Sequence, residues 1–229
     1  MKTEILDNKS AKKYTHTDSA IVLSLIFLML VGLILMNSSS ERYKRFVAED
    51  GPVEWISTIS LFSCAVICVE RAIKLKKYKS NTFYIVSLLI ALIFLLGVGE
   101  EISWGQRIIN IESPDYFIEN NLQEEFNFHN LKLGFVNINK LVFGLILGAL
   151  IAIYLIILPI LYKKKRKVKS FVDYLGLPLP RKYHILSILS TSVLIHFINA
   201  KDKWELMELT GSMLFLAIMI YPANKNSLE

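Results

Sequence analysis

The residues best suited to chemistry lie in Gly99–Arg107, which reads GEEISWGQR. Glu100 and Glu101 close an apolar run at the carboxyl end of a predicted helix, where the helix dipole disfavours negative charge. Carboxyls retained at such a membrane boundary are typical of a functional site. If the helix continues, Glu100 and Arg107 share one face, and the guanidinium keeps the carboxylate ionised. Arg107 is alternatively a ligand for an anionic headgroup or a phosphate.

A second candidate pair, Glu125 and His129, lies in the long connection that follows. On a helix these side chains are one turn apart and reach a common ligand. A carboxylate and an imidazole at that spacing suit zinc or a related divalent ion, with Glu101 as a further ligand. The same pair equally suits acid–base catalysis, with the carboxylate orienting the imidazole. A polar helix face in contact with water is the simplest alternative.

Four more ionisable residues are expected at the same depth, at the outer ends of other apolar runs: Glu54, His196, Glu205 and Glu208. Such groups usually face the interior of a helix bundle, although acids at helix starts also complement the helix dipole. We predict catalytic roles for Glu100, Glu101, Glu125 and His129. We predict substrate binding by Arg107, Gln106, Asn121 and Gln123, with the four additional residues completing or supporting the site.

The elements that position these residues are long apolar runs. The chain has 229 residues, 53% of them apolar, and a mean hydropathy of +0.44. A membrane core requires about 20 helical residues, and the longest runs lack the polar stripe of a soluble helix. The pattern predicts an all-α, polytopic membrane protein with a single integral membrane domain over residues 1–229. Six spans are expected at about 20–36, 53–70, 81–99, 141–162, 183–200 and 204–221.

The distribution of charge predicts the orientation of these spans. The net charge is +6, and Lys and Arg concentrate in the two tails and in the second and fourth connections. Six spans place all of those regions on one side, so the positive-inside rule makes both termini cytoplasmic, in a bacterial inner membrane. Lys163–Lys169 is then a topology determinant that touches anionic lipid, and no nucleic-acid partner is expected.

The long outer connection predicts an amphipathic helix over 114–129. The Ser-Pro pair at 113–114 is typical of a helix start. Ile118, Leu122 and Phe126 then form an apolar stripe. Such a helix lies on or dips into the outer interface and covers the site.

Two motifs carry a resemblance to a known group of proteins. Gly99–Arg107 and the pattern NxQxExNxHN of Asn121–Asn130 resemble a group of uncharacterised multi-pass bacterial membrane proteins. The segment Asp50–Trp55, an acid-Gly-x-x-Glu-Trp pattern, is similar to a further motif of that group. The resemblance covers roughly residues 49–130, and it implies a site there without implying an activity.

The chain is also weakly similar to glutamyl intramembrane proteases of the CAAX-processing type. Those proteases carry EExxxR, FxxxH and HxxxN on membrane helices. The counterparts here are Glu100-Glu101 with Arg107, Phe126 with His129, and His196 with Asn199. Every spacing differs, and because one residue turns a helix by about 100°, different helix faces would meet.

These observations favour an integral membrane enzyme, a hydrolase acting on a lipid or lipid-linked substrate at the outer face. The chemistry would be metal-dependent, with zinc as the candidate cofactor, or acid–base. The alternatives are a small transporter, a non-catalytic subunit of a membrane complex and an intramembrane protease. Expected partners are membrane lipids, with a second copy of the chain or a membrane complex as alternatives. The sequence has no Gly-rich phosphate loop, GxSxG or HExxH motif.

Overall fold

A computed structural model describes residues 2–134 and 136–228, and their side chains except those of residues 2–15, 136, 137, 139 and 143. The helices of the described chain are α1 (Lys2–Ser38), α2 (Ser40–Val47), α3 (Pro52–Leu75), α4 (Asn81–Glu101), α5 (Gln106–Ile109), α6 (Asp115–Asn120), α7 (Leu147–Ala152), α8 (Leu158–Lys164), α9 (Arg166–Leu175), α10 (Lys182–His196) and α11 (Trp204–Ile220). Short strands β1 (Lys132–Leu133) and β2 (Val136–Asn137) pair in antiparallel fashion. Two π-helical segments, Asn139–Ile146 and Ile153–Ile157, join α7 and α8 into one long helix.

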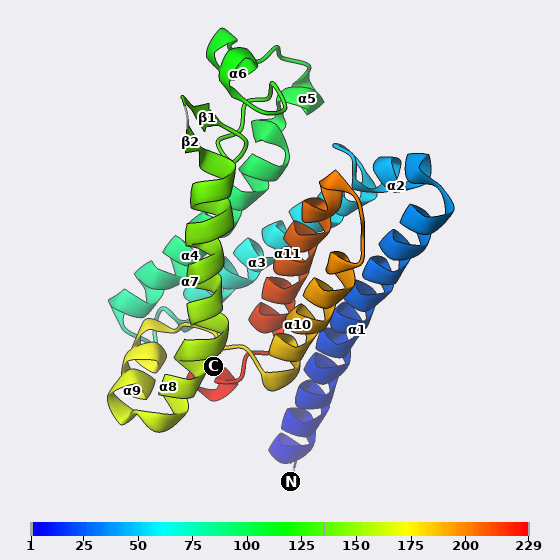
Figure 1. Ribbon diagram of the computed structural model, residues 1–229. Coiled ribbons are helices and arrows are strands. Elements are labelled where there is room, and N and C mark those ends of the chain that lie inside the picture. Colours follow the sequence, from blue (N-terminus) through cyan, green and yellow to red (C-terminus); the bar gives the residue numbers. More distant parts are fainter. Residues whose placement is uncertain (1, 135, 229) are drawn as a thin grey trace.

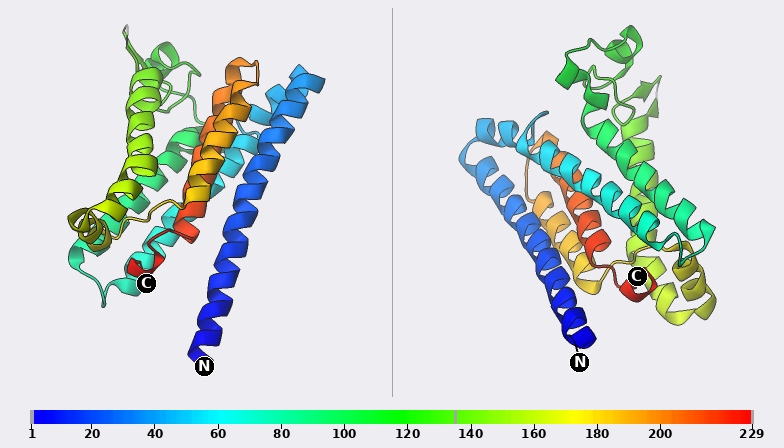
Figure 2. Two further views of the ribbon diagram at one scale, coloured as in Figure 1. Left: turned by 60° about the horizontal axis from the view of Figure 1, so that its bottom comes forward. Right: turned by 180° about the vertical axis from the view of Figure 1, so that it is seen from behind.

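The long helices alternate in direction, and both chain ends lie at the same end of the bundle (Figure 1). The opposite end carries α2 and the connection that contains α5, α6 and the strand pair (Figures 1 and 2). Helix α11 packs against α3, α1 and α10, and α3 also packs against α4. We call the end with the connection the loop end, and the end with both termini the terminal end.

Among the described residues, four segments are long and apolar enough to cross a membrane: His16–Ser38, Ser40–Leu75, Asn81–Glu101 and Lys140–Lys164. The almost wholly helical fold and these segments agree with a multi-pass membrane protein. Helices α10 and α11 have 15 and 17 residues, fewer than the about 20 that a span requires. The count of six spans, and the side on which the termini lie, therefore stay predictions.

The packed core lies along α11. Its inner face buries Leu206, Leu209 and Met213 against α1 and α10, with Leu25 and Met29 from α1. Towards the terminal end, Met219 packs against the buried thiols of α3 and against α4. Most large side chains on the outer faces of α1, α4 and α7 are apolar and exposed, which suits contact with lipid.

The predicted helix over 114–129 is wrong in its length, because α6 ends at Asn120 after about a turn and a half. The Asn121 side chain donates to the Asn127 carbonyl at 2.8 Å and accepts the Gln123 backbone N–H at 2.8 Å. Asn side chains that bond nearby backbone in this way compete with helix formation. The chain then folds back, with Glu124 at a φ of 60° and a β-bridge between Asn121 and Leu131.

The expected continuation of the third span is also interrupted. Helix α4 ends at Glu101, and Ser103, Trp104 and Gly105 have φ values of 46°, 55° and 80°. Non-glycine residues rarely adopt this left-handed conformation. The Trp104 ring lies against Gly99, where an added Cβ would be 2.9 Å from the ring, so the absence of a side chain at Gly99 lets the chain reverse there.

A buried polar contact joins the first and fifth long helices near the terminal end. Asp18 on α1 accepts hydrogen bonds from Tyr183 and from His184 Nε2, the latter at 2.9 Å. The Arg181 backbone N–H donates to His184 Nδ1 at 3.1 Å, so Nε2 carries the hydrogen given to Asp18. The side chains of His184 and Asp18 are both fully buried.

Candidate functional site: carboxyl groups at the loop end

The loop end is organised by the guanidinium of Arg107, which follows the reversal after α4. Its Nη1 lies 2.5 Å from Glu125 Oε2, its Nε lies 3.1 Å from Asp50 Oδ2, and its Nη2 donates to Glu54 Oε1. The side chains of Arg107, Glu54 and Glu125 are only 17%, 10% and 8% exposed. We call these four residues the Arg107 cluster. It joins the α2–α3 turn, the start of α3 and the long connection.

Two polar side chains, Ser103 and Asn127, extend the hydrogen bonding around Glu125. Ser103 Oγ donates to Glu125 Oε2, and Asn127 Nδ2 donates to Ser103 Oγ at 3.0 Å. Burial disfavours the charged form of Glu125, but the bonds from Ser103 and Arg107 outweigh it and lower its pKa below the ordinary value. Burial likewise opposes charge on Arg107, yet the bond to Glu125 and the charge of Glu54 raise its pKa. These two directions favour the charged forms of both Glu125 and Arg107.

Glu100 does not pair with Arg107, the partner that a continuous helix would give it. Its Oε2 accepts the backbone N–H groups of Phe128 and His129, at 2.7 and 2.9 Å, and lies 3.3 Å from His129 Nδ1. Its Oε1 accepts the Trp104 indole N–H at 3.0 Å. Glu100 thus ties the connection to the end of α4, while Arg107 pairs with other carboxylates.

The predicted substrate-binding residues hold the connection together. Gln106 Oε1 accepts the Phe126 N–H at 2.7 Å, and its Nε2 donates to Ser113 at 2.9 Å. Gln123 accepts from Asn130, and Asn121 forms the turn described above. Arg107 is surrounded by carboxylates, so an anionic headgroup would have to displace one of them to bind there.

Behind the Arg107 cluster lies a group of three carboxyls, which we call the carboxyl recess: Glu101, Glu205 and Glu208. Glu101 at the end of α4 lies within electrostatic range of both acids of α11 and of Glu54. Glu208 is exposed, and its carboxyl lies within electrostatic range of His129. The group of three carboxyls is therefore open to its surroundings at Glu208.

Two neighbouring features leave polar or open space near these carboxyls. Tyr43 of α2 is 1% exposed, interacts electrostatically with Glu205, and has a hydroxyl without a hydrogen-bond partner. A buried polar atom without a partner commonly marks a place for water or a ligand. Gly211, three residues after Glu208 on α11, has no atom within 4 Å of where a Cβ would lie, so open space continues along the helix.

The three predicted metal ligands do not share one position. Glu125 contacts Arg107, His129 contacts Glu100, and Glu101 belongs to the recess. Within residues 2–134 and 136–228, no group of three or more His, Cys, Asp or Glu side chains could hold a metal ion. The predicted zinc site is therefore not assembled in the described chain.

The remaining predicted residue, His196, ends α10 with an exposed side chain. Site residues that the sequence did not single out for a role are Asp50, Ser103, Asn127 and Tyr43. Asp50, Ser103 and Asn127 belong to the motifs quoted above. Tyr43 carries no local signal, because its role depends on how α2 packs against the start of α11.

No protein-family model, curated protein or solved structure was found to match this chain. The similarities to uncharacterised bacterial membrane proteins and to glutamyl proteases therefore stay predictions. The function has to be argued from the geometry of the loop end.

Substitution of Arg107 tests the cluster. Arg107→Gln leaves the carboxylates of Glu54 and Glu125 buried without a cation, which typically costs about 3–5 kcal/mol. We expect a large fall in the thermal unfolding temperature of the detergent-purified protein. The unfolding temperature of Arg107→Lys should lie between those of the wild type and Arg107→Gln, since one ammonium cannot reproduce three directional contacts.

The matched control for this test is Arg42→Gln, at an exposed arginine of α2 at the same end. It should leave the unfolding temperature close to that of the wild type. Equal effects of Arg42→Gln and Arg107→Gln would show that the Arg107 cluster contributes nothing specific to stability.

Cysteine labelling tests the recess. Gly211→Cys should react with a polar maleimide added to the folded protein, because the new side chain enters open space beside Glu208. The native Cys64 and Cys68 are buried and should give little background. Ala217→Cys, at a fully buried position of α11, is the control and should react only after unfolding. Protection of Gly211→Cys to the same degree would disprove an accessible recess.

Proposed function

We propose that this chain is a six-span integral membrane enzyme that uses the carboxyl recess for acid–base chemistry on a lipid or lipid-linked substrate. The observation that carries the proposal is the meeting of Glu101, Glu205 and Glu208, from two helices, within electrostatic range of one another, with Glu208 exposed. On this proposal the recess opens at the outer face of a bacterial inner membrane, with both termini inside.

Carboxyls held close together suit paired acid and base roles, because repulsion between like charges favours one group being protonated while the other is ionised. Glu208 is the accessible member and would contact the substrate. Glu101 and Glu205 would exchange protons with it or hold a polar group of the substrate. His129, which lies within electrostatic range of Glu208, would receive or return a proton.

A lipid fits this position because polar and apolar surfaces meet there. The connection above the recess exposes Leu122 and Phe128, and the neighbouring Asn139–Lys164 helix exposes Leu141, Leu145 and others. A substrate with a polar head and an apolar tail would place the head among the carboxyls. The Arg107 cluster would hold the connection in place without contacting the substrate.

Glu208→Gln tests the enzyme proposal. Loss of a catalytic acid or base typically lowers a rate about 10²- to 10⁴-fold. Lipid extracts are compared from cells that express wild type, Glu208→Gln or no protein. The amount of at least one lipid species should differ in the wild-type cells, and in the Glu208→Gln cells it should return to the amount found without the protein. Glu112→Gln, at an exposed acid of the connection, is the control and should behave as wild type.

Equal lipid profiles for wild type and a folded Glu208→Gln variant would disprove the enzyme proposal. Purified protein added to the isolated lipid species gives the direct assay. Conversion of that lipid species at equal rates by wild type and Glu208→Gln would also disprove the enzyme proposal.

One observation favours transport as a second candidate. Ser57 and Thr58 lie one turn beyond Glu54 on α3, and both are buried with hydroxyls that have no hydrogen-bond partner. A polar path extending from the acids into the bundle is what a permease requires. Proton or cation flux into proteoliposomes that is lost in Ser57→Ala and Thr58→Ala, with the lipid profile unchanged, would support transport over catalysis.

A further inference from the structure

Three sulfur-bearing side chains meet between α3 and α11, towards the terminal end of the bundle. Cys64 and Cys68 are one turn apart on α3, and both are buried in the same packed cluster as Met219 of α11. The Cys68 thiol donates to Met219 Sδ at 3.8 Å. We call Cys64, Cys68 and Met219 the sulfur group. It shares no residue with the Arg107 cluster or with the carboxyl recess.

The spacing of the two cysteines suits a shared ligand better than a disulfide. Side chains four residues apart on a helix have Cβ atoms about 5–6 Å apart, whereas a disulfide requires about 3.5–4.5 Å. Helix α3 runs without a break from Pro52 to Leu75, so closing a disulfide would distort it. Two thiols on one helix face at this spacing can instead both reach a single atom that lies between them.

The third sulfur lies at a distance that a metal ion would bridge. A bond between a metal and a cysteine sulfur is about 2.3 Å long, so two sulfurs on one trigonal or tetrahedral metal are about 3.8–4.0 Å apart. The distance of 3.8 Å between Cys68 Sγ and Met219 Sδ agrees with this value. These two sulfurs therefore need little movement to bind one ion.

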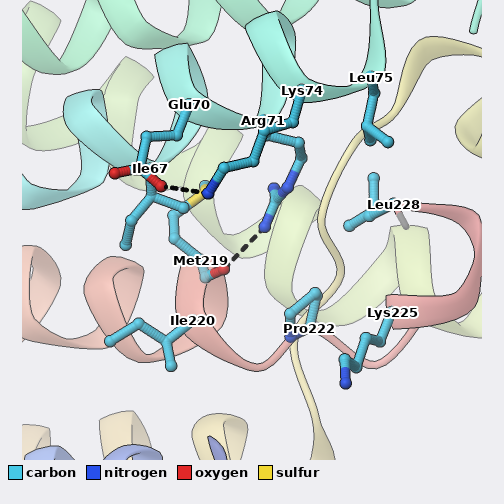
Figure 3. Close-up of a pocket in the computed structure, with 10 residues that line it drawn as sticks. All are labelled: Ile67, Glu70, Arg71, Lys74, Leu75, Met219, Ile220, Pro222, Lys225 and Leu228. Carbon is cyan, nitrogen blue, oxygen red and sulfur yellow. Dashed lines mark hydrogen bonds and ion pairs between the residues drawn. The ribbon is translucent and has the colours of Figure 1, made fainter. Parts of the chain in front are cut away.

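The surroundings hold Met219 in place and give access to it. Arg71, on the turn of α3 that follows Cys68, donates to the Met219 carbonyl oxygen at 2.9 Å, a bond drawn in Figure 3. Apolar side chains of α3 and α4 enclose the sulfur group. Met219 also lines a pocket at the ends of α3 and α11 (Figure 3), so an ion that enters from the terminal end meets this residue first.

We propose that the sulfur group binds one monovalent copper ion, Cu(I). Thiolate and thioether sulfurs are soft ligands that select Cu(I), whereas Mg²⁺, Ca²⁺ and Mn²⁺ prefer oxygen. Zn²⁺ usually takes four ligands, and over residues 2–134 and 136–228 no His, Asp or Glu side chain joins the two cysteines in a metal-binding group. This site does not depend on the proposed enzymatic function.

The charges balance when Cu(I) binds. At least one of the two thiols releases its proton to water, since the thiolate is the form that binds metal. One thiolate neutralises the single positive charge of the ion, and the thioether of Met219 adds none. A neutral complex of this kind costs less to bury among apolar side chains than a divalent ion with the same ligands.

Copper binding to the purified protein tests the proposal. Wild type is reduced in detergent, freed of reductant and titrated with Cu(I) without oxygen, in competition with a coloured Cu(I) chelator. We expect one Cu(I) per chain, and X-ray absorption should show three sulfur neighbours at about 2.3 Å from the copper. Failure of wild type to take copper from the chelator, or a shell of nitrogen and oxygen alone, would overturn the proposal.

Met219→Leu is the sharpest variant, because it removes one sulfur and keeps an apolar side chain of similar volume. It should lower the affinity for Cu(I) about tenfold or more, since even the loss of a residue that only orients a metal ligand costs about 10- to 100-fold. The number of sulfur neighbours should fall from three to two. Met213→Leu, at another buried methionine of α11, is the matched control and should bind Cu(I) as wild type does. Equal losses of affinity in the two variants would overturn the proposal.

A last arm uses stability and a competing metal. Bound Cu(I) links α3 to α11, so its addition should raise the unfolding temperature of wild type. The double variant Cys64→Ala, Cys68→Ala should neither bind Cu(I) nor show this rise. An equal rise in the double variant would contradict binding at the sulfur group. Displacement of Cu(I) from wild type by equimolar Zn²⁺ would assign the site to zinc and overturn the proposal.

Discussion

The loop end depends on a single cation. Arg107 contacts carboxylates from the α2–α3 turn, the start of α3 and the long connection, segments that no other buried ion pair described here joins. Glu54 and Glu125 are costly to bury alone, and repulsion among the three carboxylates would push the segments apart. One guanidinium with donors in fixed directions satisfies all of them. It thereby ties the connection over residues 102–138 to α3 and the α2–α3 turn.

Arg107 cannot also neutralise the acids behind it. Glu101, Glu205 and Glu208 repel one another and interact with few positive groups. The left-handed turn at Ser103–Gly105 separates the two sets of acids. It directs Arg107 towards Glu125, whereas an uninterrupted helix would have carried it alongside Glu100. Strained backbone of this kind persists only where surrounding contacts enforce it, and here the buried Ser103 bonds both Glu125 and Arg107.

The sequence was informative for features that depend on neighbouring residues, and uninformative for contacts between residues far apart in the chain. Uninterrupted apolar runs predicted the long helices and placed Glu54, Glu101, Glu205 and Glu208 at one end of the bundle. The apolar stripe of the connection was misleading, since Ile118 and Leu122 have helical spacing but Asn121 between them ends α6 by bonding the backbone. The partners of Arg107 and Asp18 lie tens of residues away in the chain. Periodicity carries no information about such pairings, and they decide how the site is built.

The short length of α11 gives a physical reason for the recess. Its 17 residues span about 26 Å, less than the roughly 30 Å of a membrane core. If α11 crosses the membrane as proposed and Ile220 lies at one boundary, Glu208 lies about 18 Å along the helix from that boundary. A carboxylate at that depth is tolerated only where water or another polar group reaches it. On the proposed topology, retaining Glu208 on so short a helix would therefore require water or a polar partner beside it, and catalysis or transport would use that same water.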